Sequence, residues 1–78
     1  MREGWAVAQR TETFRVEGMT CEGCRAAVAR VLERTPGVAR AEVDLEGASA
    51  TVTYDPARVT PEALAEAVRR AGYALAPA

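Results

Sequence analysis

The sequence contains no histidine and no lysine, so all ten of its basic residues are arginine. Without histidine, the chain lacks the commonest nitrogen ligand for metals and the commonest general base of enzymes. The formal net charge is −1, and no basic run is present to attract a nucleic acid or a membrane surface. No apolar stretch reaches the roughly 18 residues that a membrane-spanning helix requires. These absences argue against a nucleic-acid partner and against direct membrane insertion.

The chain is also short, with 78 residues. A chain of this size forms one domain and buries only about 60% of the surface that its unfolded form exposes. Its core is therefore thin, and little room is left for a deep substrate cavity. We expect no catalytic residues and no enzymatic activity from the domain itself.

The only two cysteines, Cys21 and Cys24, lie three residues apart, where a strand-like pattern gives way to a helix-like one. Residues with this spacing are neighbours on a helix surface. The unpaired N–H groups and the dipole at a helix start favour thiolate, the form that binds metals. The position therefore predicts a thiolate site. We expect Cys24, at the helix start, to have the lower pKa and Cys21, in the loop, to move more freely.

The number of ligands limits which metal such a site can hold. Thiolates select soft or borderline ions such as Cu(I) and Zn(II). A structural zinc site is almost always four-coordinate, and two cysteines without histidine cannot complete one. Cu(I) and Hg(II) accept two thiolates in a near-linear arrangement. Cu(I) is therefore the favoured metal, Hg(II) is the alternative, and Zn(II) is disfavoured.

Hydrophobic periodicity indicates the order of the elements around this site. Alternation of apolar and polar residues predicts strands over residues 11–17, 40–45, 48–54 and 73–75. Helical spacing predicts one helix beginning at Cys24 after a loop over residues 18–23. The order β-α-β-β-α-β predicts an α+β fold, a ferredoxin-like βαββαβ sandwich. In it, a four-stranded antiparallel sheet carries two helices on one face.

The second predicted helix has clear signals at both ends. Thr60 suits the N-cap, Pro61 suits the first helical position, and Gly72 suits the position after the helix. Tyr73 then enters the last strand. Right-handed crossovers place the start of that strand at the same end of the sheet as the cysteine loop. We therefore expect Tyr73 to lie near the cysteines.

The segment Gly18-Met19-Thr20-Cys21-x-x-Cys24, placed after a strand in this element order, resembles the heavy-metal-associated domain family. The resemblance covers residues 11 to about 75. The family includes copper chaperones, N-terminal domains of copper-transporting P-type ATPases, and mercury-binding proteins and reductase domains. It implies transfer of a metal ion to a partner, either a metal-transporting ATPase or another Cys-x-x-Cys domain. The chain would then be a free carrier or a domain of an ATPase or of a mercuric reductase.

The resemblance also implies roles for individual residues. Cys21 and Cys24 would be the metal ligands, and Met19 a buried support rather than a ligand. Tyr73 resembles the aromatic residue beside the site in bacterial copper members. Thr20 stands where zinc-exporting relatives carry an aspartate, which counts further against zinc.

Other loop residues have expected roles that follow from their chemistry. Gly18 and Gly23 relieve steric limits where the backbone turns and approaches the ion. Thr20 is a candidate hydrogen-bonding residue of the loop. Glu22 and Arg25 put charges around the cysteines, where many relatives have small or uncharged residues, and we expect them to tune the choice of partner.

Two other interpretations of the cysteines remain. They could form a structural disulfide, although such bonds are rare in cytosolic proteins. They could instead be the redox pair of a thiol–disulfide oxidoreductase, but the chain is short for a thioredoxin-like fold. The beginning of the chain lacks the apolar segment of a secretory signal, which favours the cytoplasm.

The division of the chain follows from where the periodicity begins. Residues 1–10 have no clear period, and we interpret them as a flexible leader or linker in which Trp5 contacts the fold as part of a tail. Residues 11–78 form the domain. We expect a monomer, with a metal-bridged dimer as the alternative.

Overall fold

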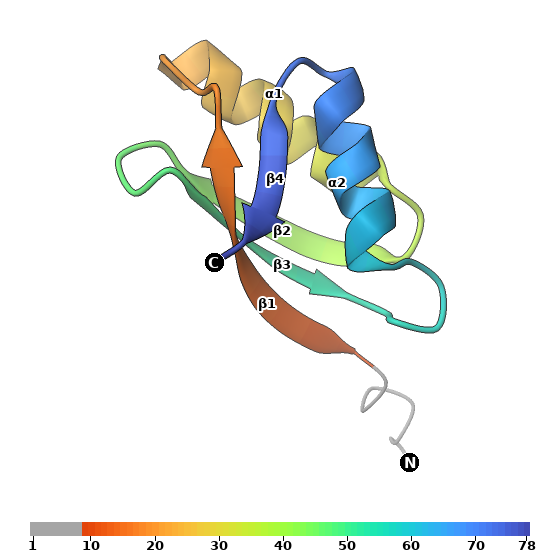
Figure 1. Cartoon of the computed structure of the whole chain (residues 1–78). Coiled ribbons are helices and arrows are strands. Elements are labelled where there is room, and N and C mark those ends of the chain that lie inside the picture. Colours follow the sequence, from red (N-terminus) through yellow and green to blue (C-terminus); the bar gives the residue numbers. More distant parts are fainter. Residues whose placement is uncertain (1–8) are drawn as a thin grey trace.

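The computed structural model describes residues 9–78 and contains four strands and two helices (Figure 1). In chain order these are β1 (Arg10–Glu17), α1 (Glu22–Arg34), β2 (Val38–Asp44), β3 (Ser49–Tyr54), α2 (Pro61–Arg70) and β4 (Ala74–Pro77). The predicted βαββαβ order is confirmed. Trp5 lies outside the described residues. No helix in the described part of the chain is long and apolar enough to cross a membrane.

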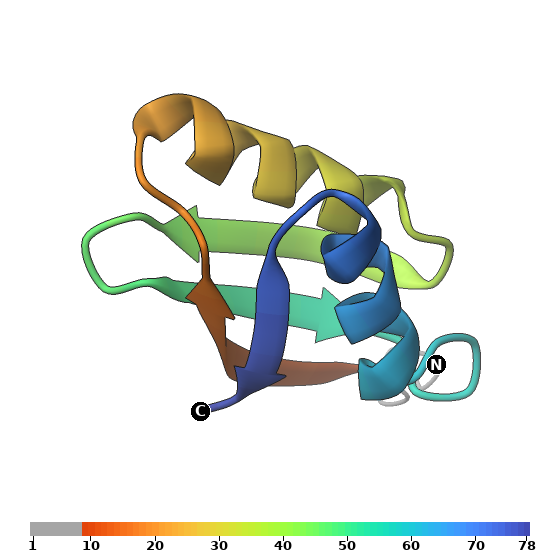
Figure 2. The ribbon, with the colours of Figure 1, turned by 45° about the horizontal axis from the view of Figure 1, so that its top comes forward.

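The four strands form one antiparallel sheet in the order β2-β3-β1-β4. Both helices cover the same face of this sheet (Figure 2). β1 lies in the middle, with Phe14 opposite Ala50 of β3 and opposite Pro77 of β4. β4 is short and pairs only with residues 14–17 of β1. Among the strands of residues 9–78, the first half of β1 therefore has a neighbour on the β3 side alone.

The core lies between the sheet and the helices, as the alternating pattern predicts. β1 contributes Phe14 and Val16, and β3 contributes Ala50, Val52 and Tyr54. The helices contribute their apolar stripes, which are Val28, Leu32, Leu64 and Val68. The opposite face of the sheet is polar, and threonine hydroxyls pair across β1 and β3, as in the 3.0 Å contact between Thr11 Oγ1 and Thr53 Oγ1.

The ends of α2 are those that the sequence indicates. Thr60 is the N-cap, and its Oγ1 accepts a 3.1 Å hydrogen bond from the backbone N–H of Ala63. Pro61 is the first helical residue, where its missing N–H leaves no bond unmade. Gly72 follows the helix with φ +100°, a left-handed conformation that favours glycine.

Several predicted boundaries are wrong by one or a few residues. β1 includes Arg10, which periodicity assigned to the leader, and β2 begins at Val38 rather than at residue 40. The strand expected over residues 48–54 is present but begins one residue later, at Ser49, because Ala48 has φ +51° and belongs to the turn. The backbone conformation of the turn ends the strand pattern, although the apolar and polar side chains still alternate there. For the same reason β2 ends at Asp44, and Leu45, which was expected in that strand, lies after it.

The last strand also differs from the prediction, spanning Ala74–Pro77 rather than residues 73–75. Tyr73 precedes the strand, and its N–H is hydrogen-bonded to the carbonyl of Val68 at 3.2 Å. This bond belongs to the end of α2, which delays the start of the strand by one residue. Tyr73 is thereby held at the end of the sheet where β1 also ends.

Candidate metal site

The cysteine loop connects the end of β1 with the start of α1. Gly18 turns the chain with φ +99°, a conformation that costs glycine little and other residues more. α1 begins at Glu22, earlier than the predicted start at Cys24. The reason is that the Cys21 carbonyl accepts the N–H of Cys24 at 3.0 Å and that of Arg25 at 3.1 Å, which closes a helical turn. Cys21 is therefore the N-cap residue, and Cys24 lies in the first turn of the helix.

The two sulfurs point toward each other at the surface. Cys21 Sγ and Cys24 Sγ are 3.5 Å apart. Both cysteines are free; Cys21 is exposed and Cys24 is half-buried. The N-cap conformation of Cys21 includes no side-chain capping bond, so its sulfur is not committed to the helix. The site thus offers two thiol groups to a ligand arriving from solvent.

Gly23 lies inside α1, and its expected role as a turn residue is wrong. Within residues 9–78, the glycines with a left-handed backbone are Gly18, Gly37 and Gly72. A Cβ at position 23 would lie 3.7 Å from Cys21 Sγ, which is ordinary van der Waals contact. Neither the backbone conformation nor a close contact therefore requires glycine at this position.

The pKa of the Cys24 thiol is lowered to about 6. The largest cause is a hydrogen bond from the backbone of Thr20, followed by hydrogen bonding with Tyr73, with the Thr20 hydroxyl and with Cys21. Thr20 Oγ1 lies 3.7 Å from Cys24 Sγ. Cys24 is therefore largely thiolate at neutral pH. Hydrogen bonds from the loop, rather than the helix start alone, produce the low pKa that we expected.

Tyr73 lies beside the loop, as the crossover argument predicts. A Cβ at Gly18 would lie 3.4 Å from Tyr73 Cδ1, so the ring packs closely on the loop backbone. Its interaction with Cys24 raises the pKa of the Tyr73 hydroxyl. The phenol remains protonated at neutral pH and can donate to the thiolate.

Met19 and the nearby charged residues complete the surroundings of the sulfurs. Met19 is half-buried and packs against the core. Glu22 forms an ion pair with Arg25, whose Nε donates to Glu22 Oε2 at 2.6 Å, and this bond lowers the pKa of the Glu22 carboxyl. Among residues 9–78, no cluster of three or more histidine, cysteine, aspartate or glutamate side chains is placed to hold a metal ion. The two sulfurs are thus the main donors of the site.

The distance between the sulfurs fits a two-coordinate soft ion after a small movement. With a metal–sulfur bond of about 2.3 Å, a linear S–metal–S unit would separate the sulfurs by about 4.6 Å. That is roughly 1 Å more than the observed 3.5 Å. The exposed Cys21 side chain makes no capping bond that would oppose such a movement.

Fold and site together define a small α+β domain with a pair of free thiols at a helix start. Residues 13–74 match the family of the heavy-metal-associated domain, which covers most of the sequence. The chain belongs to the heavy-metal-associated domain family.

Its relatives handle more than one metal. The chain is 44% identical over 62 residues to copper chaperone CopZ of Staphylococcus haemolyticus, covering 80% of this chain and 91% of the relative. It is 38% identical over 69 residues to the mercuric transport protein periplasmic component of Pseudomonas fluorescens, covering 88% of this chain and 75% of the relative. Oxidized MerP from Ralstonia metallidurans CH34 superposes with a TM-score of 0.85 at 35% identity, covering 88% of this chain and 96% of that one.

Some relatives are much longer than this chain. It is 36% identical over 76 residues to the copper-exporting P-type ATPase of Staphylococcus saprophyticus, covering 97% of this chain but only 10% of the ATPase. The chain therefore corresponds to one small domain of that protein and to nearly the whole of the chaperone.

Proposed function

We propose that the chain binds one Cu(I) ion through Cys21 and Cys24 and passes it to the thiolates of a partner. The observation that carries this proposal is the pair of free thiols at the surface, one exposed and one half-buried, whose sulfurs lie 3.5 Å apart. Cu(I) is satisfied by two thiolates, whereas zinc requires more ligands, and the described residues offer no cluster of three or more ligands. The copper chaperone relative supports the same choice.

Transfer proceeds by exchange of one thiolate for another. A partner thiolate approaches the exposed side and bonds to the ion as a third ligand. The bond to Cys21 then breaks, because Cys21 is the more exposed cysteine and its side chain is not held by a capping bond. Cys24, whose thiolate is stabilised by the Thr20 backbone and by Tyr73, releases the ion last. No covalent bond of a substrate is made or broken, so we assign no enzymatic activity to the domain.

The partner that fits this exchange carries a similar dithiol site. We propose a metal-transporting ATPase or another Cys-x-x-Cys domain, consistent with the copper-exporting ATPase among the relatives. The domain acts as a monomer, with a metal-bridged dimer as the alternative. We propose the cytoplasm as its location, since free thiols persist in a reducing compartment.

Hg(II) delivery is the second candidate. The mercuric transport relative favours it, and Hg(II) accepts the same two sulfurs. Under this alternative the same cysteines and the same exchange operate, and only the ion and the partner differ.

A competition titration tests the proposal. The reduced protein is titrated against a Cu(I) chelator, and then against Hg(II) and Zn(II), with native mass spectrometry to count bound ions. We expect one Cu(I) per chain, displaced by Hg(II) but not by Zn(II). Cys24→Ser should abolish tight binding while circular dichroism shows an intact fold. Wild-type affinity in Cys24→Ser would refute the site.

An insulin-reduction assay separates the carrier from a thiol–disulfide oxidoreductase. Two free thiols at this distance are close enough for oxidation to a disulfide, so the test is needed. A carrier gives no sustained turnover, and repeated turnover would replace our proposal with a redox function.

A further inference from the structure

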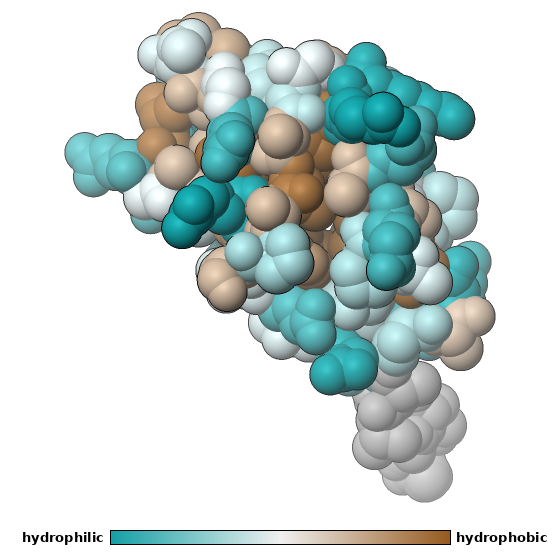
Figure 3. All heavy atoms as spheres, viewed as in Figure 1, coloured by the Kyte–Doolittle hydropathy of each residue, from teal (hydrophilic) through white to brown (hydrophobic). Residues whose placement is uncertain are grey.

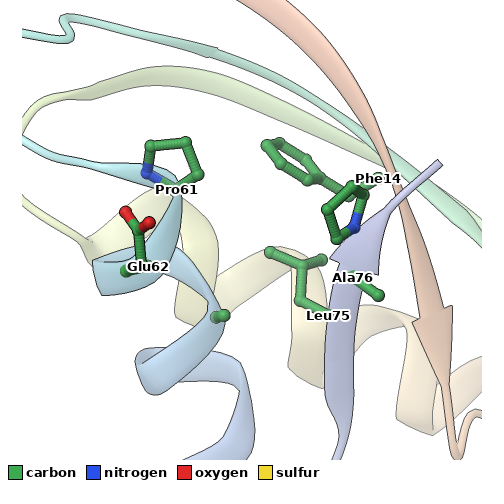
Figure 4. A pocket seen from close by; sticks show the side chains of 7 residues that line it. Phe14, Pro61, Glu62, Leu75 and Ala76 are labelled. Carbon is green, nitrogen blue, oxygen red and sulfur yellow. The ribbon is translucent and has the colours of Figure 1, made fainter.

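An apolar groove lies between α2 and β4, at the end of β4 that is remote from Tyr73 and the cysteines. Its volume is about 260 Å³. Figure 3 shows apolar side chains gathered between these two elements and surrounded by hydrophilic ones. In Figure 4, Phe14 of β1 and Leu75 of β4 line one side of the groove, and Pro61 and Glu62 of α2 line the other.

The groove exists because α2 presents a small side chain, Ala65, toward β4. The start of α2 therefore stands away from the sheet without a large side chain of its own to fill the gap. The hollow has room for one bulky apolar side chain. Its lining exposes far less surface than the roughly 800 Å² per partner that a standard protein–protein interface buries. A single side chain from a nearby segment is therefore a better occupant than a second copy of the chain.

The chain enters β1 at the same end of the molecule. Arg10, the first residue of β1, pairs with Tyr54, and the first residues of β1 run beneath the start of α2 (Figure 2). Glu62 of the groove wall lies near this pair: the pKa of Tyr54 is raised by burial, by Glu12 and, to a smaller extent, by Glu62. Because β4 pairs with residues 14–17 alone, no strand of the described residues covers this edge of β1 beside the groove.

The residues before β1 are long enough to reach the groove, and they include a side chain that suits it. Trp5, the only tryptophan, lies five residues before Arg10, a span of up to about 17 Å when extended. Phe14, on the groove wall, lies four residues after Arg10, about 13 Å along the strand. Tryptophan carries the largest apolar ring, and its indole N–H tolerates a partly wet site such as a groove rim.

We infer that the segment before β1 turns back along its open edge and inserts the Trp5 ring into the groove between α2 and β4. This contact goes beyond the proposed metal transfer, since it lies at the opposite end from the thiols. It fastens the leader to the domain while leaving Cys21 and Cys24 free. Trp5 itself belongs to residues 1–8, outside the described part of the chain.

The fluorescence of Trp5 tests this inference in the full-length protein. A docked ring emits at shorter wavelength than free tryptophan and is protected from iodide quenching. Ala65→Glu, which places a charged side chain in the groove, should move the emission to that of free tryptophan and remove the protection. Ala63→Glu is the matched control: it makes the same substitution on an exposed position of α2 and should leave the emission unchanged.

Each alternative has its own result. Emission like that of free tryptophan in the wild-type protein overturns the inference. A buried signal that Ala65→Glu does not change places Trp5 elsewhere and also overturns it. A signal that appears only as protein concentration rises indicates docking between copies. Nuclear Overhauser contacts from the indole to Phe14 and Leu75 would confirm the docked position, independently of whether the wavelength shift is large.

Discussion

The two helices of this domain begin with different N-caps. At α2, the hydroxyl of Thr60 accepts the N–H of Ala63, and Pro61 occupies the first helical position. At α1, Cys21 has the same extended backbone, but its side chain makes no capping bond. Each helix has an acidic residue in its first turn and at least one basic residue in its last. The charges at the helix ends are therefore alike, and the N-cap side chain is what differs.

The difference shows where the domain gives up helix stability for a binding site. An N-cap side chain typically stabilises a helix by about 0.5–2 kcal/mol. α2 has this stabilisation and carries no metal ligand. α1 lacks it, because a sulfur bonded to its own helix would not be available to a metal. The better-capped helix supports the fold, and the other supports the site.

Replacement of the N-cap cysteine should separate these two roles most clearly. Cys21→Ser removes a ligand, so the loss of Cu(I) affinity should exceed the roughly 10- to 100-fold cost of losing an outer-shell partner. The same change supplies a good N-cap and should stabilise the metal-free domain by up to about 1 kcal/mol. Competition titration and urea unfolding measure the two effects.

Cys24→Ser is the matched comparison. It also removes a ligand, but the new hydroxyl lies within the helix and caps nothing. Affinity should be lost in both variants, while stability should rise only in Cys21→Ser. Equal urea midpoints for the two metal-free variants would contradict the comparison between the helix starts.

Removal of the N-cap side chain of α2 should lower the stability of the domain without changing its Cu(I) affinity. Thr60→Ala removes the capping bond and should cost about 1 kcal/mol, which lowers Tm by about 4–8 °C in a domain of this size. Thermal unfolding of the metal-free protein measures the loss. Cu(I) affinity should not change, because Thr60 lies at the start of α2, away from the cysteines. A large loss of affinity would mean that the two helix starts are coupled.

The smallest expected effect concerns the thiolate of Cys24. Its pKa of about 6 means that metal binding and alkylation should weaken as pH falls through that value, because protons then compete for the sulfur. Tyr73→Phe removes a hydrogen bond that stabilises the thiolate, so its pKa should rise and binding between pH 6 and 7 should weaken slightly. The pH dependence of iodoacetamide labelling at Cys24, read by mass spectrometry, measures the shift.

Tyr54→Phe is the control for this variant. It removes the only other tyrosine hydroxyl, which donates to Glu12 at 3.1 Å. It should alter stability without moving the labelling profile. If Tyr54→Phe moves the profile as much as Tyr73→Phe does, Tyr73 does not act through its contact with Cys24.

Much of this architecture can be predicted from the residues. The alternation around Phe14 and Val52 predicts which face of the sheet is buried, since a strand points successive side chains to opposite faces. Thr60, Pro61 and Gly72 mark the ends of α2 because each suits one backbone position there. Cys21 and Cys24 stand out as the only thiols. The start of α1 was harder to predict, because no capping side chain marks it.

The sequence by itself determined the ligand chemistry and the element order, because both depend on residue type and local spacing. Only the tertiary structure decided that the Thr20 backbone and Tyr73 stabilise the Cys24 thiolate, and that a groove remains between Ala65 of α2 and β4. Such features depend on how elements distant in the chain meet, and packing distances of a few ångströms are not encoded in periodicity.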